Sequence, residues 1–378
     1  MSNPVEVMDE MDVRVLSSVS ANPVGSLVEL ARLSRMTLGT FSERMRLLGE
    51  RGILYPVFAQ ASVSYSAVGL SQVVVLADVP PVHRNTFEAA CDTHPYAQYR
   101  IRCLGRIESS NFFCTFSVPA GAKSGLIAFL ETLQQEGVVT RFATSMPLAR
   151  VARTEYDFNA YDFAKRTWKV DWKQWEYVVE TASSRLENLS PSVLHLLDSA
   201  DMKILRLLSM DARQERRKIA DKVGIRDYDL SRRLGLYLKR GVIEGYRVIH
   251  DRNIAGYALT VAVSARVPFR LTEKLFAGFS ALPFPGIFFP LEKGFIFIGN
   301  VPPAEVGKLS SSLEQYCERV ELSTCDYASS ARYHFDSEPS NYKEGYGWID
   351  SREYMVEEPM AAILALKQNL PSREKKIA

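Results

Sequence analysis

The sequence predicts an α+β protein made of two winged helix-turn-helix modules, each followed by a ferredoxin-like βαββαβ domain. Three observations lead to this fold class. The chain has 378 residues, which is enough for at least two domains. Its 47% hydrophobic and 24% charged residues are typical of a soluble globular protein. Finally, the two halves of the chain resemble each other in residue type and spacing.

The internal repeat begins at the first acidic cluster. At an offset of 189 residues, the stretch from Asp9 to Leu54 aligns without a gap to a stretch that begins at Asp198. The matched pairs are Asp9 and Asp198, Asp12 and Asp201, Arg44 and Arg233, and Gly52 and Gly241. The offset then falls to 187, which carries residues 67–70 onto 254–257. So many spaced matches indicate a duplication.

The front of each repeat has helical periodicity. Apolar residues recur at helical spacing in three successive segments, and a glycine follows the third one. In the first copy the helices contain Val13 to Val19, Val28 to Leu33 and Leu38 to Leu48, with Thr37 as the N-cap of the third. In the second they contain Ile204 to Leu208, Ile219 to Val223 and Leu230 to Leu238. Short strands at 53–58 and 242–249 should form a wing hairpin in each module.

The back of each repeat alternates strands and helices in the order βαββαβ, which is the ferredoxin-like pattern. The first copy should have strands at 72–79, 98–104, 112–118 and 138–144, with helices at 84–90 and 123–135. The second should have strands at 259–267, 286–290, 295–300 and 320–324, with helices at 271–279 and 303–317. The expected domains are 1–66, 67–148, an aromatic linker at 149–190, 191–253, 254–327 and a C-terminal extension at 328–378.

These features resemble the Lrp/AsnC (feast/famine) family of transcriptional regulators. Three features carry the resemblance. Each copy has an acidic residue, Asp12 or Asp201, three residues after another acid, and an arginine eight residues before a glycine. A βαββαβ domain follows in each copy. Members of that family ordinarily have one repeat and pair through the βαββαβ domain. The resemblance therefore implies a tandem form in which a dimer is fused into one chain, acting as a DNA-binding transcriptional regulator.

A helix-turn-helix module places its third helix in the major groove. The candidate DNA-binding residues of the second module are Arg213, Arg216, Arg217, Lys218, Arg226, Tyr228, Ser231 and Arg232. Those of the first module are Thr37, Thr40, Ser42 and Arg46. Residues 190–252 have a net charge of +5 and residues 1–60 a net charge of −1. Because phosphate contacts supply most of the affinity, the second module should be the main reader of DNA.

Alternatives stay open for several of these residues. Arg44 and Arg233 could form a salt bridge with Asp12 or Asp201 of the first helix instead of contacting DNA. The first module could contact a protein partner, having lost DNA binding. The family also binds small effectors near a Gly-x-x-Asp turn. The weak counterparts of that turn here are Gly105, Glu108 and Gly294.

A second class of protein shares this architecture. Siroheme decarboxylases resemble Lrp-type proteins but are enzymes, in which His and Arg residues contact a tetrapyrrole. His94, Arg100 and Arg102 are similar to that region, and arginine suits carboxylate binding. The matching stretch of the second copy, 283–289, has no histidine or arginine. No nucleotide-binding or hydrolase motif occurs, so we expect no enzyme activity, no cofactor and no metal.

The remaining features concern partners and location. Five cysteines without a CxxC pair indicate reduced core thiols. The chain has no signal-peptide layout and no run of about 20 apolar residues, which predicts a cytoplasmic protein without membrane contact. Three of the four tryptophans lie in the linker, where they should cover a sheet or pack the copies together. The partners expected are double-stranded DNA, a small-molecule effector and a second copy of the fused chain.

Overall fold

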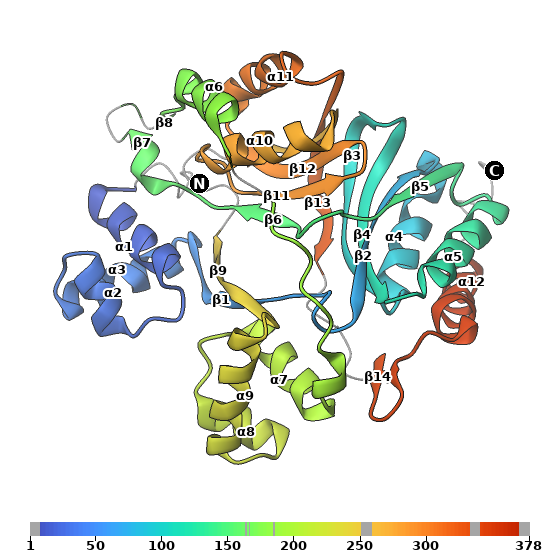
Figure 1. The fold of residues 1–378 in the computed structure, drawn as a ribbon, viewed down its shortest axis with the longest axis horizontal. Helices are drawn as coiled ribbons and strands as arrows, with labels where there is room; N and C mark the ends of the chain where they lie inside the picture. Colours follow the sequence, from blue (N-terminus) through green and yellow to red (C-terminus); the bar gives the residue numbers. More distant parts are fainter. Residues whose placement is uncertain are drawn as a thin grey trace. The chain divides into compact units, whose positions relative to one another are not determined.

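The structure is a computed structural model, drawn in Figure 1, which describes residues 8–162, 165, 167–183, 186–250, 259–332 and 341–369. The chain forms two compact units. Unit 1 consists of Met1–Ser64, Pro147–Ser190 and Leu207–Cys325, and unit 2 of Tyr65–Met146, Pro191–Arg206 and Asp326–Ala378. Residues 254–257 of the repeat and the predicted boundary at 253 lie outside the described residues. The mixture of helices and strands is consistent with the α+β class.

Unit 1 opens with three helices whose starts follow from their capping residues. They are α1 (Glu10–Ala21), α2 (Leu27–Leu33) and α3 (Leu38–Glu50). Asp9 and Ser26 begin α1 and α2 in capping boxes, and Thr37 caps α3 as predicted. One apolar residue of each helix, Leu16, Leu30 and Phe41 respectively, is fully buried.

The equivalent region of the second copy contains α7 (Ser199–Met210), α8 (Arg216–Val223) and α9 (Asp227–Lys239). The boundary between the two units falls within α7. The predicted wing hairpins are wrong. Each module instead contributes one long strand, β1 (Leu54–Val63) and β9 (Ile243–His250), and the two strands pair with each other antiparallel.

The sheet of unit 1 has the ferredoxin-like order. Its elements are β10 (Leu259–Arg266), α10 (Phe269–Ser280), β11 (Gly286–Leu291), β12 (Gly294–Val301), α11 (Val306–Glu314) and β13 (Arg319–Arg332). The strands follow the order β13-β10-β12-β11, and β6 (Ala152–Thr154) adds to the β11 edge. Phe279, Phe288 and Phe295 form the aromatic centre of its core.

The aromatic linker packs against the second copy's domain within unit 1. It forms β7 (Tyr161–Asp162), β8 (Thr167–Trp168) and α6 (Trp172–Thr181), which lies beside α10 (Figure 1). Gly278 of α10 makes this approach possible, because an added Cβ would lie 2.6 Å from Val179 and 2.8 Å from the Trp175 indole nitrogen. Five aromatic residues of the linker are therefore part of the hydrophobic core of unit 1: Tyr156, Phe158, Tyr161, Trp168 and Trp175.

Unit 2 contains the first copy's βαββαβ domain. Its elements are β2 (Leu70–Asp78), α4 (Arg84–Thr93), β3 (Ala97–Ile107), β4 (Ser110–Pro119), α5 (Lys123–Gln135) and β5 (Arg141–Ser145). The strand order β5-β2-β4-β3 repeats that of unit 1. Cys91, Cys103 and Cys114 are buried in this domain, which agrees with the expectation of core cysteines.

The C-terminal extension packs on this domain in unit 2. It forms β14 (Tyr342–Lys343), β15 (Gly347–Trp348), a π-helical turn (Glu353–Glu357) and α12 (Glu358–Asn369), which contacts α4. The Trp348 indole donates to the Val68 carbonyl at 2.7 Å, and the Tyr96 hydroxyl donates to the Ile349 carbonyl at 2.7 Å. The extension of each copy thus covers the domain of the other copy.

Short 3-10 turns complete the described backbone at Pro81–His83, Phe158–Ala160, Leu194–Leu196 and Pro303–Glu305. Within the described ranges, no helix combines the length and hydrophobicity needed to cross a membrane.

Candidate nucleic-acid interface

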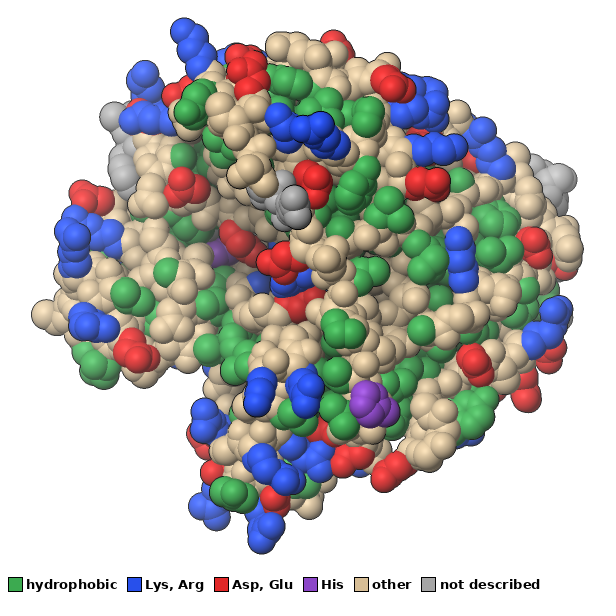
Figure 2. Space-filling view, in the orientation of Figure 1, with side chains coloured by type: hydrophobic (Ala, Val, Ile, Leu, Met, Phe, Trp, Pro, Cys, Tyr) green, Lys and Arg blue, Asp and Glu red, His purple; other side chains and the backbone are tan. Residues whose placement is uncertain are grey.

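A cationic surface covers the outer side of α8 and α9 in unit 1, which we call the α8–α9 face. Its members are all exposed: Arg216, Arg217, Lys218, Arg226, Tyr228 and Arg232. Figure 2 shows Lys and Arg side chains gathered over these two helices. Ser231, the last residue predicted here, is half-buried. The structure therefore brings together the predicted residues of the second module, except Arg213.

The local sequence explains why these side chains point outward. Gly224 ends α8 in the left-handed conformation, with φ of 81°, which glycine adopts without strain. The apolar side of α9 is anchored by Leu230 and Tyr237, both fully buried. Arg226 occupies the N-cap of α9 without a side-chain cap, and acids in the first turn favour the helix dipole instead.

The acids near this face neutralise little of its charge. Lys218 pairs with Glu215 at 3.1 Å and Arg226 with Asp229 at 2.9 Å, and both basic side chains stay largely exposed. Exposed pairs of this kind contribute little and exchange readily with other anions. The α8–α9 face can therefore bind phosphate groups of a nucleic acid.

Arg213, the remaining predicted residue of the second module, contacts the first module. Its guanidinium donates to the carbonyls of Pro23 at 2.9 Å and Gly25 at 2.8 Å, and it lies 5.0 Å from the ring centre of Phe58. All three partners belong to the first module. Because these contacts hold the side chain against protein, Arg213 does not extend from the α8–α9 face.

The first module presents a different surface. Arg46 is bound by Glu43 and Glu50 of its own helix, which raise the pKa of its guanidinium. The Thr37 and Thr40 hydroxyls bond each other at 2.9 Å at the start of α3, while Ser42 is exposed. Several apolar side chains of the first module are also exposed: Val24, Leu27, Val28, Leu33 and Leu38. This surface is neutral and partly apolar.

The salt-bridge interpretation of Arg44 is confirmed. Its guanidinium contacts Asp9 at 2.6 Å and the buried Asp12 at 3.2 Å, and Arg51 contacts Asp12 at 2.8 Å. These ion pairs tie α3 to the start of α1. Arg44 is thus a structural residue of the first module.

The weak effector residues lie at the ends of strands or in the turns that join them. Gly105 and Glu108 are exposed near the β3–β4 turn of unit 2, where Glu108 has φ of 47°. In unit 1, Gly294 has φ of 135°, and an added Cβ would lie 1.9 Å from the Ala265 carbonyl oxygen. The backbone alone requires glycine at position 294. Effector binding at these residues stays a prediction.

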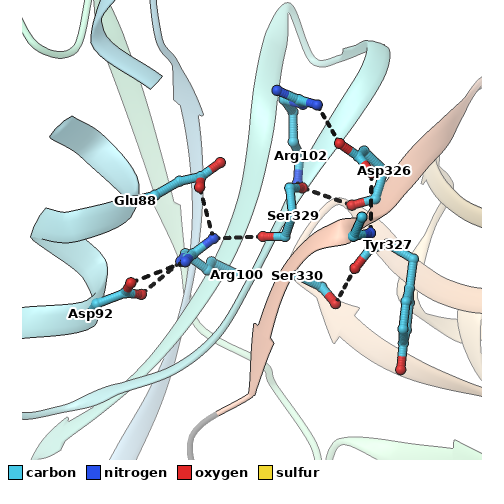
Figure 3. Close-up of polar contacts among 9 residues, drawn as sticks. Glu88, Asp92, Arg100, Arg102, Asp326, Tyr327, Ser329 and Ser330 are labelled. Carbon is cyan, nitrogen blue, oxygen red and sulfur yellow. Dashed lines mark hydrogen bonds and ion pairs between the residues drawn. The ribbon is translucent and has the colours of Figure 1, made fainter. Parts of the chain in front are cut away.

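The residues similar to siroheme decarboxylases are occupied by internal contacts in unit 2. Arg100 binds Asp92 at 2.8 Å, Glu88 at 3.4 Å and the Ser329 carbonyl at 2.5 Å, while Arg102 is paired with Asp326 (Figure 3). These contacts hold the end of β13 beside β3. The two arginines do not form an open carboxylate site.

His94 lies in the core of unit 2, only 3% exposed. Its ring packs 5.1 Å from Phe116 and 4.7 Å from Phe129, and its Nδ1 accepts the Tyr96 amide at 3.2 Å. Burial lowers its pKa to about 3. The imidazole is therefore neutral at physiological pH, and the backbone amide of His94 caps the C-terminus of α4 by donating to the Ala90 carbonyl.

Acid should destabilise the protein partly through His94. Because its pKa is lower in the folded than in the unfolded chain, the unfolded chain binds more protons between pH 6.5 and 3. The free energy of unfolding then falls with pH, by about 1.4 kcal/mol per unit. His94→Asn keeps an acceptor for Tyr96 without a titrating group. Between pH 7 and 5, urea unfolding should show wild type losing about 2 kcal/mol more than this variant.

The exposed His195 provides the control for this experiment. His195→Asn should retain the acid sensitivity of the wild-type chain. Equal losses in the His94 and His195 variants would show that burial of His94 contributes nothing to the pH dependence.

Unit 1 also contains a cavity of about 400 Å³ between β9 and the ends of the aromatic linker. Arginines and glutamates line it in equal numbers: Arg150, Arg153 and Arg247 with Glu155, Glu187 and Glu244. Arg150 pairs with Glu187 and, at 3.1 Å, with Glu244. Burial raises the pKa of Tyr246 in its wall, an effect that the nearby positive charge of Arg216 opposes. The cavity has mixed charge, unlike the α8–α9 face.

Comparison with protein-family models found no match, and comparison with curated protein sequences found none. Solved structures do match. The siroheme decarboxylase NirDL matches 95% of this chain and 100% of its own, with a TM-score of 0.55 and 14% identity. Its complex with an iron-uroporphyrin III analogue matches with a TM-score of 0.53 and 14% identity, over 94% of this chain and 100% of that one.

Lrp/AsnC-type regulators match a smaller part of the chain. B. subtilis LrpC has a TM-score of 0.32 and 18% identity, covering 39% of this chain and 98% of its own. E. coli AsnC has a TM-score of 0.30 and 13% identity, covering 38% and 94%. The expectation that this chain is not an enzyme is contradicted, because the structures matching nearly its whole length are those of a decarboxylase. The chain has the fold of siroheme decarboxylase NirDL, which is an Lrp/AsnC-like fold.

Proposed function

We propose that this chain is a DNA-binding protein of the Lrp/AsnC type in which α9 enters the major groove and the start of α8 contacts phosphates. The α8–α9 face is the observation that carries the proposal. Arg216, Arg217 and Lys218 occupy the first turn of α8, and Arg232 projects from α9. The neutral surface of the first module supports an unequal contribution of the two modules.

The proposal includes a fused dimer, which the β1–β9 ladder supports. Leu54 pairs with His250 and Val63 with Ile243. The repeat offsets of 189 and 187 relate Leu54 to Ile243 and Val63 to His250, so the two pairs are equivalent. A pseudo-twofold axis would then pass at Gln60 and Arg247, which lie opposite each other 187 residues apart.

The axis pair itself favours a fused chain over two identical ones. The Arg247 guanidinium donates to the Gln60 side-chain oxygen at 2.8 Å. In a symmetric dimer of two identical chains, the residue on the axis would lie opposite the same residue of the partner. Two copies of the second module would therefore place two arginines opposite each other, and these would repel. Fusion allows the two copies to differ and to form this hydrogen bond.

Duplex binding tests the proposed function. Fluorescence anisotropy of labelled genomic-pool and selected duplexes, titrated with the full chain between 50 and 300 mM salt, should give a steep negative slope of log affinity against log salt. Four neutralised phosphates would give a slope of about −3.6. Absence of binding to any duplex at low salt would refute the proposal.

A second candidate is binding of a tetrapyrrole carboxylic acid, as in siroheme decarboxylases. The match over nearly the whole chain favours it, and the three cavity arginines offer carboxylate partners. The equal number of glutamates weakens it, since a polyanionic ligand would meet like charge. Incubation with siroheme tests this candidate: a saturable shift of its absorbance spectrum with release of carbon dioxide would support the enzyme, and an unchanged spectrum would count against it.

A further inference from the structure

The turn before α8 is docked onto the first module within unit 1. The Ala212 amide donates to the Ala59 carbonyl of β1 at 2.8 Å. Next to it, the single Nη1 of Arg213 donates to two carbonyls, those of Pro23 and Gly25. The guanidinium also lies against the Phe58 ring, an arrangement that favours a cation. Charge-assisted hydrogen bonds of this kind are stronger than neutral ones.

The same turn is fixed on its own side. The Arg213 amide donates to the Asp211 carboxylate at 2.9 Å, and the Gln214 side chain donates to the Leu207 and Asp211 carbonyls at 3.1 Å each. Helix α8 begins three residues after Arg213, at Arg216. The contacts of Arg213 therefore determine where the first turn of α8 lies relative to the first module.

The two copies have different residues at this contact, so that the second copy can bind the first in this way but the first cannot bind the second. The repeat offset of 189 places Arg213 opposite Val24, which stands between Pro23 and Gly25. Arg213 thus binds the turn that corresponds to its own in the other copy. Two identical copies would bring two guanidinium groups together, whereas the half-exposed Val24 leaves the carbonyls open to a single arginine.

We propose that Arg213 is a positioning residue for DNA binding: it holds the start of α8, and with it Arg216, Arg217 and Lys218, against the first module without contacting DNA. The proposal rests on the proposed function. It also assigns a task to the first module, which supports the second instead of reading DNA.

The test compares Arg213→Ala and Arg213→Lys with Arg14→Ala, a matched control on α1, in the full chain. Arg213→Ala should weaken duplex binding about 10-fold while leaving the slope against salt unchanged, because it removes no phosphate contact. Removing a phosphate contact, as in Arg216→Ala, should reduce the magnitude of that slope by about 0.9. Arg213→Lys retains one donor for the carbonyls and should recover part of the affinity. Circular dichroism establishes that each variant is folded.

Hydrogen exchange without DNA gives an independent readout. Amides at the start of α8 should exchange faster in Arg213→Ala than in the wild-type or Arg14→Ala chains. A double-mutant cycle with Phe58→Leu should be non-additive in duplex affinity, since both changes remove the same contact.

Two results would overturn the proposal. One is that Arg213→Ala reduces the magnitude of the salt slope by about 0.9 and that its effect on duplex affinity is additive with that of Phe58→Leu. This result would make Arg213 a phosphate contact. The other is unchanged exchange in α8 together with unchanged affinity. If the wild-type chain binds no duplex, the proposed function fails by itself, and the exchange data still decide whether Arg213 fixes α8.

Discussion

Replacing Arg216, Arg217 and Lys218 together by alanine is expected to weaken duplex binding about 100-fold at 150 mM salt. Each neutralised phosphate contributes about 0.9 to the salt slope, so each lost contact costs roughly fivefold at this concentration. The three side chains are exposed on one turn, and Lys218 pairs with the exposed Glu215. The magnitude of the slope should fall by up to about 2.7.

The control removes the same charge from the first module. Three arginines of this module are exposed or paired with acids of their own helices: Arg14, Arg32 and Arg46. Replacing all three by alanine should change duplex affinity less than about threefold. Anisotropy titrations of the two triple variants measure the difference. Equal losses would mean that both modules contact DNA alike, or that only total charge matters.

Asp12→Ala should lower the free energy of unfolding by about 3–5 kcal/mol, the range for breaking a buried ion pair. The Asp12 side chain is 1% exposed and binds both Arg44 and Arg51. It also accepts the Asp9 amide at 3.3 Å in the capping box of α1. Its loss leaves two guanidinium groups without their shared carboxylate. Urea unfolding of the full chain, followed by circular dichroism, measures the change.

Asp9→Ala is the matched control, because Asp9 is half-exposed and shares Arg44. It should cost about 1 kcal/mol, as expected for loss of an N-cap. Partial burial opposes ionisation of Asp9, but the Asp12 amide and Arg44 outweigh it and lower its pKa. An Asp12 variant no less stable than the Asp9 variant would show that burial of the ion pairs adds nothing.

Much of the fold follows from local sequence. The helix at 123–135 was predicted to the residue, because its apolar spacing and flanking turns are local signals. The wings were mispredicted as hairpins, because Leu54 and Ile243 have the same strand propensity whichever strand they pair with. Strand pairing across 187 residues depends on the dimer-like arrangement, which a single repeat does not specify.

The candidate site was only partly predictable. Charge and helical periodicity are enough to place Arg216 and Arg232 on an outer surface. Arg213 has the same charge but binds Pro23 and Gly25, and no local pattern distinguishes an arginine that meets carbonyls of a distant turn. For the same reason, His94 and Arg100 resembled ligand-binding residues in sequence, although the structure surrounds them with their own aromatic and acidic partners.

The extension of each copy covers the domain of the other copy, and this arrangement has a consequence for biosynthesis. Residues 341–369 cover Tyr96 and helix α4, yet they leave the ribosome about 200 residues after that domain, which ends with β5 at Ser145, at 5–20 residues per second. During that interval, tens of seconds at the slower rate, the nascent first half lacks the cover over Tyr96 and α4, and a chaperone could recognise the uncovered surface. A nascent chain stalled before residue 341 should therefore be more sensitive to protease near Tyr96 than the released protein.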